Sequence, residues 1–277
     1  METNVLVQQA IAGDKSALEA VVGFIQDDLY YLALRMLANP DDAKDATQEI
    51  LIKIITKLST FKFESQFKTW AYRIASNYLI TEKKIKSKDQ NLTYDLYKAD
   101  LESDLQDPDQ FKDLPEYPIM LNELRITCTM AMLLCLNSAH RMAYILGDIF
   151  ELEHQEASEI LSITKDNFRQ QLSRARAKVV EFTSTSCGLV SASAKCQCEK
   201  KLVGAVSRLR VDPKRIQFSN HDNSAYSEVK RLIRETRESL QTLKLQNYIV
   251  HYKCPIEFSH MIESLVVDSG SLVRKFN

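Results

Sequence analysis

The sequence predicts an all-α fold: two helical domains joined by an acidic linker, followed by a mostly helical C-terminal extension. Three observations point to this class. Apolar residues recur at helical spacing over long stretches, for example Ile50, Leu51, Ile54, Ile55 and Leu58. Only 6 Gly and 6 Pro occur in 277 residues, which leaves little material for the tight turns of a β-rich fold. Charge is segregated along the chain, although its 36 Lys and Arg nearly balance its 37 Asp and Glu.

The first 88 residues are expected to form a helical bundle. A short first helix is followed by one that Asp14 caps and that runs to Asn39-Pro40. A third helix is expected to begin at a cap formed by Asp41 or Asp42, because both side chains can accept backbone hydrogen bonds. Ser65 is the expected cap of a fourth helix, which ends in a run of lysines.

Charge divides the chain into segments with different expected roles. Residues 53–88 carry a net charge of +7, residues 89–116 carry −7 and residues 165–178 carry +4. The acidic stretch contains several prolines and shows little periodicity, so residues 89–120 are expected to be a flexible linker. The two basic segments indicate two nucleic-acid-binding modules, and solvated helix faces are the alternative explanation of such runs.

The sharpest local pattern predicts a helix-turn-helix at residues 154–179. A short apolar helix leads into the turn Ser162-Ile163, and Thr164 is a suitable N-cap for a second helix. The inner face of that helix consists of apolar residues at helical spacing: Phe168, Leu172, Ala175 and Val179. The outward stripe consists of exposed donor side chains: Lys165, Arg169, Gln170, Ser173, Arg174 and Lys178. Such a stripe suits the major groove of DNA, whereas an ordinary helical hairpin with a basic solvated face is the alternative.

Four segments occur in an order and spacing that match one known family. They are Ala12-Gly13-Asp14, residues 41–49, residues 61–77 and the helix-turn-helix that ends at Arg176. Together they resemble the extracytoplasmic-function (ECF) group of bacterial RNA polymerase sigma factors, over about Leu6 to Phe182. The resemblance implies a non-enzymatic protein that binds core RNA polymerase and directs promoter-specific transcription initiation. It divides the chain into region 2 (residues 1–88), linker (89–120), region 4 (121–182) and extension (183–277).

The resemblance also implies roles for particular side chains. Region 2 would dock on the clamp helices of the polymerase β′ subunit through Asp45, Gln48 and Glu49, and the β subunit is a further expected contact. Melting and reading the minus-ten element require aromatic rings and cations for an unstacked base, and the implied residues are Phe63, Lys68, Tyr72, Arg73 and Asn77. Region 4 would bind the minus-35 element through the outward stripe. Trp70 lies on an apolar stripe and is expected in the core. Ser162 stands where the family has Gly, and Ser is tolerable there only if its φ is negative.

The extension goes beyond the two-domain plan of the family. Three of the six Cys fall within twelve residues of it: Cys187, Cys196 and Cys198. These thiols would bind Zn²⁺ or Cu(I) with Cys254 or His251 as a fourth ligand, act as a redox switch, or stay reduced. Cys128 and Cys135 are expected in the core. Residues Ser227–Gln246 are expected to form one amphipathic helix, which inhibits the sigma domains, contacts a partner or belongs to an ordinary small domain.

Localisation and partners follow from what the sequence lacks. No apolar run approaches the ~18 residues of a membrane span, and the polar N-terminus is unlike a signal peptide, so a cytoplasmic protein without a membrane partner is expected. No cofactor is expected to be required, and promoter DNA and an anti-sigma factor are expected partners.

A helix-turn-helix regulator that acts without polymerase is the alternative function, and it would not need the Asp45 surface. A metal-dependent nuclease is disfavoured, because the motifs of nucleotide-binding loops and zinc hydrolases are missing.

Overall fold

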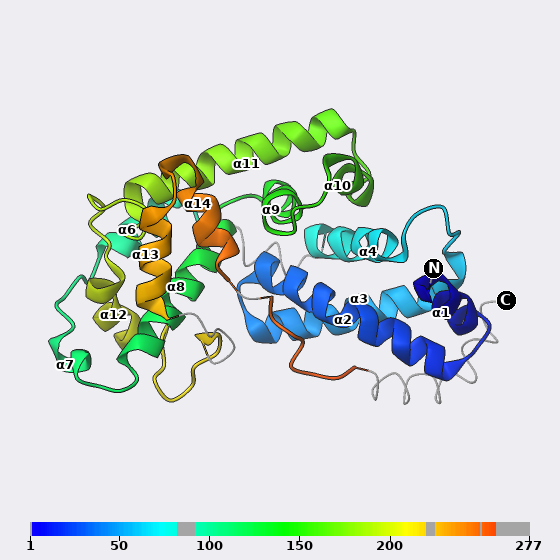
Figure 1. Ribbon diagram of the computed structural model, residues 1–277, viewed down its shortest axis with the longest axis horizontal. Coiled ribbons are helices and arrows are strands. Elements are labelled where there is room, and N and C mark those ends of the chain that lie inside the picture. Colours follow the sequence, from blue (N-terminus) through cyan, green and yellow to red (C-terminus); the bar gives the residue numbers. More distant parts are fainter. Residues whose placement is uncertain (1, 82–91, 220–224, 250, 259–277) are drawn as a thin grey trace. The chain divides into compact units, whose positions relative to one another are not determined.

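The computed structural model describes residues 2–81, 92–219, 225–249 and 251–258, and in these ranges it contains helices and connecting segments without a β-strand. The predicted all-α class is confirmed. The chain forms two compact units, whose helices are shown in Figure 1. The first unit comprises Met1–Thr81, Glu159–Ser162 and the segment from Tyr252 onward, and the second comprises Glu82–Ser158 and Ile163–His251.

The first unit is a bundle whose helix ends follow from local hydrogen bonding. Its helices are α1 (Glu2–Ile11), α2 (Lys15–Leu37), α3 (Pro40–Lys57), the 3-10 turn η1 (Leu58–Thr60) and α4 (Phe67–Thr81). Asp14 caps α2 as predicted, because its carboxylate accepts a hydrogen bond of 3.0 Å from the Ala17 amide. The predicted cap of α3 was wrong. Asn39 takes that role by accepting from the amides of Asp41 and Asp42 (2.9 Å each), since Pro40 favours the first helical position.

The core of the first unit is apolar and ends in an aromatic cluster. Val21, Ile25 and Leu29 of α2 are at most 1% exposed, and they lie among the buried residues of α3 and α4. The Trp70 ring lies 5.4 Å from the centroid of Phe61 and 5.9 Å from that of Phe67, but it is only half-buried, so it packs on these rings without lying within the core as predicted. These rings fix the connection between η1 and α4.

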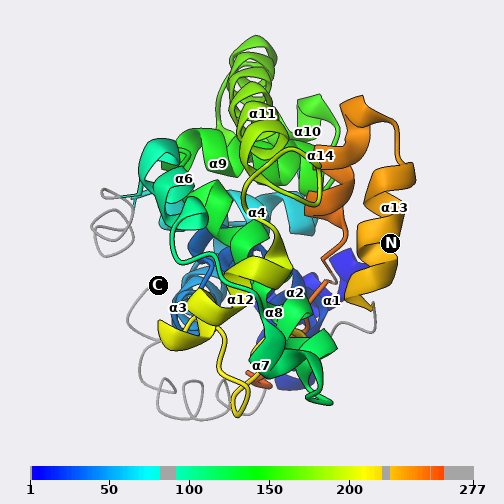
Figure 2. The same cartoon turned by 90° about the vertical axis from the view of Figure 1, so that its left-hand side faces the viewer.

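The second unit contains the remaining helices. They are α6 (Tyr94–Glu102), α7 (Asp109–Lys112), α8 (Tyr117–Leu134), α9 (Ser138–Tyr144), the π-helical turn η2 (Ile145–Ile149), α10 (His154–Leu161, which ends in the first unit), α11 (Lys165–Ser186), α12 (Cys198–Ser207), α13 (Tyr226–Glu235) and α14 (Glu238–Asn247). Figure 2 shows α12 and α13 on either side of α8, and both pack against it. Arg141, fully buried, donates to the carbonyls of Leu133 (2.9 Å) and Leu136 (2.9 Å) and so closes the end of α8.

The segment expected to be a flexible linker is folded where it is described, from residue 92 to residue 120. The Tyr97 ring is 5% exposed and stacks on Phe182 at a centroid distance of 5.5 Å. The Tyr97 hydroxyl donates to the Cys128 carbonyl at 3.0 Å. Helix α6 is therefore part of the core of the second unit.

The acidic charge of this segment is neutralised by the extension, which explains why the prediction failed. Asp100 accepts hydrogen bonds from Arg208 (2.7 Å) and Arg210 (2.9 Å). Lys201, whose side chain is 2% exposed, donates to the Ser103 carbonyl at 3.0 Å. Because Arg and Lys side chains of the extension neutralise this acidic stretch, charge repulsion no longer prevents it from folding.

The extension is not a separate domain, contrary to the boundary placed at residue 183. The buried Glu123 carboxylate on α8 accepts from the amides of Phe218 (2.9 Å) and Ser219 (2.8 Å). The hydroxyls of Thr183 and Thr242 share a hydrogen bond of 2.5 Å. Residues 121–182 and the described extension up to His251 therefore form a single core.

The single amphipathic helix expected at Ser227–Gln246 was also wrong. The structure divides it into α13 and α14, with Thr236 in an extended conformation between them (φ −76°, ψ 142°). Val229 and Ile233 are fully buried, but Leu240 on the supposed continuation of the stripe is 49% exposed. The apolar periodicity extends across a chain reversal that periodicity alone does not reveal.

Candidate nucleic-acid interface

Helices α10 and α11 form the predicted helix-turn-helix. The Thr164 side chain accepts from the Asn167 amide at 3.2 Å, so the predicted N-cap of α11 is confirmed. The Ile163 amide donates to the Ser158 carbonyl at 3.1 Å and closes the turn. Ser162 has φ +55°, which contradicts the expected negative φ, because the turn requires the left-handed region that Gly adopts freely.

The inner face of α11 is held by contacts that the sequence only partly predicted. The four predicted inner residues are at most 2% exposed: Phe168, Leu172, Ala175 and Val179. Gly147 of η2 was missed: a Cβ atom there would lie 2.7 Å from the Leu172 Cδ2 atom, so any other residue would force the Leu172 side chain to shift. Arg176 donates from Nε (3.0 Å) and Nη2 (2.5 Å) to the Asp148 carboxylate, whose side chain is 5% exposed. These contacts fix the orientation of α11 on η2.

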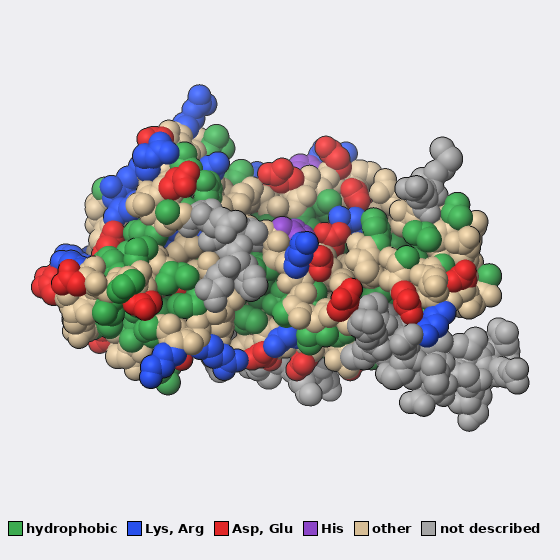
Figure 3. Space-filling view, turned by 60° about the horizontal axis from the view of Figure 1, so that its bottom comes forward, with side chains coloured by type: hydrophobic (Ala, Val, Ile, Leu, Met, Phe, Trp, Pro, Cys, Tyr) green, Lys and Arg blue, Asp and Glu red, His purple; other side chains and the backbone are tan. Residues whose placement is uncertain are grey.

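The outward stripe of α11 is exposed as predicted. All six residues are exposed: Lys165, Arg169, Gln170, Ser173, Arg174 and Lys178. Within the described part of the chain, the hydrogen bonds of Arg169 are long, 3.5 Å to Asp166 and 3.5 Å to His154 Nδ1, so its guanidinium can reorient toward a ligand. Burial and the positive charges of Lys178 and Arg174 lower the pKa of His140, which marks a positive potential beside the stripe. In Figure 3, Lys and Arg side chains lie on the surface together with Asp and Glu side chains.

A cavity of about 560 Å³ in the first unit brings together two of the residues predicted to bind single-stranded DNA. Phe63 and Lys68 line it, together with Phe24 of α2 and the polar side chains of Asn4 and Gln66. The centroids of the Phe63 and Phe61 rings lie 4.7 Å apart, and the Phe63 backbone has φ +59°. An aromatic wall beside amide groups is the chemistry that an unstacked base requires.

The remaining predicted residues of this group lie along α4. Asn77 is exposed and Arg73 is half-buried. Lys68 forms an ion pair of 2.7 Å with Asp28, and its Nζ atom lies 5.5 Å from the Tyr72 ring centroid. Tyr72 is 1% exposed and belongs to the core, so its predicted role as an exposed stacking platform was wrong. The buried face of α4 is wider than the apolar stripe and includes Tyr72.

The residues expected to bind polymerase share the outer face of α3. Asp45 and Glu49 are exposed and Gln48 is half-exposed, while Ala46 and Ile50 on the opposite face are buried. The structure thus presents two carboxylates and an amide on one helix face, available to a partner.

The three Cys of the extension lie at the junction between α11 and α12. Cys187 caps the end of α11, Cys198 begins α12, and the Gly188 amide donates to the Cys196 carbonyl at 3.0 Å. Among the described residues, no group of three or more His, Cys, Asp or Glu side chains is arranged to hold a metal ion. Burial raises the pKa of all three thiols, which keeps them neutral. Metal binding by these thiols therefore stays a prediction without geometric support, and Cys254, one of the two suggested fourth ligands, belongs to the first unit.

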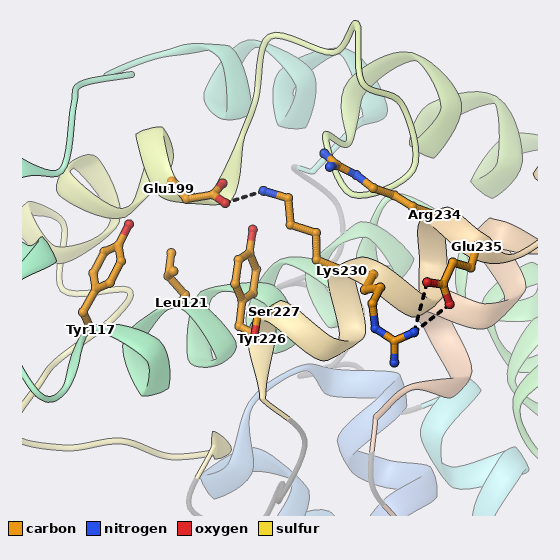
Figure 4. Close-up of a pocket in the computed structure, with 9 residues that line it drawn as sticks. Tyr117, Leu121, Glu199, Tyr226, Ser227, Lys230, Arg234 and Glu235 are labelled. Atoms are coloured by element: carbon orange, nitrogen blue, oxygen red, sulfur yellow. Dashed lines mark hydrogen bonds and ion pairs between the residues drawn. The ribbon is translucent and has the colours of Figure 1, made fainter.

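A further cavity, of about 530 Å³, lies in the second unit between α8, α12 and α13. Figure 4 shows the side chains of Tyr117, Leu121 and Tyr226 at one end of it, and the ion pair between Lys230 and Glu199. Arg231 pairs with Glu235 at 2.8 Å. Arg234 also lines this cavity, to which we assign no role.

Comparison with known proteins gives these surfaces a context. Residues 25–88 match the family model for Sigma-70 region 2, and residues 126–179 match that for Sigma-70 region 4. The chain is 31% identical over 172 residues to the ECF RNA polymerase sigma factor SigW of Bacillus subtilis, which covers 61% of this chain and 90% of the relative. The chain belongs to the ECF sigma factors.

A second relative agrees with this assignment, and one solved structure aligns weakly with the chain. The sigma factor is 28% identical over 184 residues to the ECF RNA polymerase sigma-E factor of Haemophilus influenzae, with 63% of this chain and 91% of the relative covered. A solved complex of the sigma factor RpoE with the anti-sigma factor NepR from Bartonella quintana aligns with a TM-score of 0.39 and 20% identity, over 59% of this chain and 94% of that chain.

Membership of this family establishes the activity. The protein is a sigma factor that binds core RNA polymerase and directs promoter-specific transcription initiation, and a regulator that acts without polymerase is not favoured, because region 2 is present. Its relatives are sigma factors rather than enzymes. None of the helices in the described part of the chain is long and apolar enough to cross a membrane.

Proposed function

We propose that the sigma factor divides initiation among three surfaces. The outer face of α3, with Asp45, Gln48 and Glu49, docks on the β′ clamp helices of core polymerase. The cavity beside Phe63 takes an unstacked base of the minus-ten element. The outward stripe of α11 binds the duplex of the minus-35 element.

The exposed stripe of α11 is the observation that carries this proposal. Its six donor side chains point away from a buried inner face, while Arg176, on the same helix, is bound by Asp148. Arg and Gln on an exposed helix read guanine and adenine edges in the major groove, and Lys at its borders binds phosphate. The stripe therefore has both reading and positioning groups.

The minus-ten interaction is assigned to fewer residues than the sequence suggested. Phe63 would stack on the unstacked base, and Lys68, Arg73 and Asn77 would contact the strand beside it. Tyr72 supports Lys68 from within the core instead of touching DNA. The β subunit and an anti-sigma factor stay proposed partners of the exposed surfaces.

Reversing charge on α3 tests the polymerase contact. We expect Asp45→Lys/Glu49→Lys to weaken binding of purified full-length protein to core polymerase at least tenfold, with an unchanged helical CD spectrum. Run-off transcription on genomic fragments should fall in parallel. The matched control is Asp113→Lys/Glu116→Lys, which makes the same charge change at exposed positions of the second unit. Equal affinities of both variants would remove the α3 face from the interface.

A further inference from the structure

The cavity beside Phe63 is completed by residues that precede the match to region 2. Thr3 and Asn4 of α1 and Phe24 of α2 line this cavity of about 560 Å³, and the match begins at residue 25. Helix α1 packs against α2, η1 and α4, which brings its first turn to the connection that carries Phe63. In Figure 1, α1 lies at the end of the bundle where this connection runs. The cavity is therefore built jointly by region 2 and the N-terminal helix.

The aromatic side chains of the cavity are open to an occupant. Phe24 is 49% exposed and Phe63 is half-buried, whereas Phe67 belongs to the core. The Phe63 backbone has φ +59°, a conformation that residues other than glycine keep only where the surrounding structure imposes it. A base that stacks on exposed aromatic rings withdraws them from water. Phe24 and Phe63 thus give a planar ligand two aromatic side chains in one cavity.

The charges of the cavity favour a neutral base over a phosphate. Lys68, which lines the cavity, forms an ion pair of 2.7 Å with Asp28. The Glu64 carboxylate also lines it and has no ion-pair partner within the described ranges. In the same part of the chain, the side-chain amide of Asn4 makes no hydrogen bond. An unpaired carboxylate repels a phosphate, but it accepts hydrogen bonds from the N–H groups of a base.

These two polar groups match one class of base edge. A carboxylate only accepts hydrogen bonds, so Glu64 requires an N–H donor, whereas the Asn4 amide can also donate. Adenine, cytosine and guanine each carry an exocyclic amino group and an acceptor on the Watson–Crick edge, the edge by which flipped bases are read. Thymine has a single N–H between two carbonyl oxygens, and these oxygens would face the carboxylate. The cavity therefore suits a base with an amino group better than it suits thymine.

We infer that the cavity selects an unstacked base that carries an exocyclic amino group. Glu64 accepts from that amino group, and Asn4 of the N-terminal helix donates to an acceptor on the same edge. The inference rests on the proposed role of the cavity in binding a base of the minus-ten element. A site built to hydrogen-bond one ligand rejects an analogue that leaves its polar groups unpaired. Promoters with thymine at the position bound in the cavity are therefore used less.

Run-off transcription by core polymerase with the full-length sigma factor tests this inference. The templates carry each of the four bases in turn at every minus-ten position of a promoter that this holoenzyme uses. We expect one position at which thymine lowers transcript yield at least about tenfold relative to the best base with an amino group. Glu64→Gln and Asn4→Ala should each reduce this ratio at least threefold at that position and leave the other positions unchanged. The matched control is Gln9→Ala, which removes an exposed amide of the same helix that does not line the cavity and should keep the wild-type ratio.

Phe63→Ala distinguishes failure of this inference from failure of the proposed function. Loss of the stacking ring should lower transcript yield and weaken base preference at the position bound in the cavity, with an unchanged helical CD spectrum. If Glu64→Gln and Asn4→Ala kept the wild-type ratio at the position that Phe63→Ala affects, or if thymine were preferred there, the inference alone would be overturned. If Phe63→Ala left yield and preference unchanged at every minus-ten position, the proposed role of the cavity would be wrong.

Discussion

Arg174 and Arg176 are two residues apart on α11, yet they have different expected roles, DNA binding for Arg174 and a structural ion pair for Arg176. Substituting each by Ala distinguishes these two roles. Arg176 holds the Asp148 carboxylate, whose side chain is 5% exposed. Removing one partner of a buried ion pair costs about 3–5 kcal/mol, and an exposed pair contributes about 0–1 kcal/mol. Because the Arg176 side chain is 54% exposed, we expect Arg176→Ala to destabilise the second unit by about 1–2 kcal/mol.

Thermal unfolding followed by CD measures this difference. A loss of 1 kcal/mol lowers Tm by roughly 2–4 °C for a protein of this size. Arg174→Ala should leave Tm unchanged, but it should weaken binding to all duplex sequences about equally and reduce the salt slope by about 1, as expected of a phosphate contact. If Arg176→Ala kept the wild-type Tm and lost DNA affinity as Arg174→Ala does, the assigned structural role of Arg176 would be wrong.

Three further predictions use the same structure. Ser162→Gly should raise the free energy of unfolding by about 0.5–1 kcal/mol in urea titrations, because glycine adopts φ +55° without strain. Arg169→Ala should relax recognition at one base pair by about 1–3 kcal/mol in competition binding to single-base promoter variants, whereas Arg174→Ala should not. Burial opposes ionisation of Asp100, but the hydrogen bond from Arg210 and the charges of Arg210, Lys201 and Arg208 prevail and hold its pKa below the usual value. This stabilisation is complete above the unfolded pKa of about 4 and is lost as pH falls through the lowered pKa, so Asp100→Asn should destabilise the protein to urea at neutral pH and progressively less in acid.

Local sequence patterns predicted the features that local interactions determine. Asp14 and Thr164 were identified as caps because a cap acts within three residues of itself. The outward stripe of α11 followed from its inner face, since helical geometry fixes one once the other is known. The prediction of the α3 cap was wrong because Asn39, Asp41 and Asp42 can all accept backbone hydrogen bonds. Pro40 favours the first helical position, which makes Asn39 the cap.

Features that depend on distant parts of the chain could not be read in this way. Asp100 and Arg208 are 108 residues apart, so the acidic segment seemed to lack partners that would let it fold. Gly147 gives Leu172 room to pack on η2, and no turn or cap pattern reveals this contact. The polymerase face of α3 was predicted only by resemblance, because exposed Asp and Glu on a helix are ordinary in any soluble protein.

The shared core of region 4 and the extension determines how control by the extension has to be studied. A truncation after Phe182 would leave the Glu123 carboxylate buried without the amides of Phe218 and Ser219, and it would remove Arg208 and Arg210 from Asp100. A buried carboxylate without partners is strongly destabilising, so such a protein would lose activity through unfolding of its DNA-binding unit. Loss of transcription after truncation would therefore say nothing about inhibition. Point variants that leave these contacts in place are therefore needed to separate an effect of the extension on activity from its effect on folding.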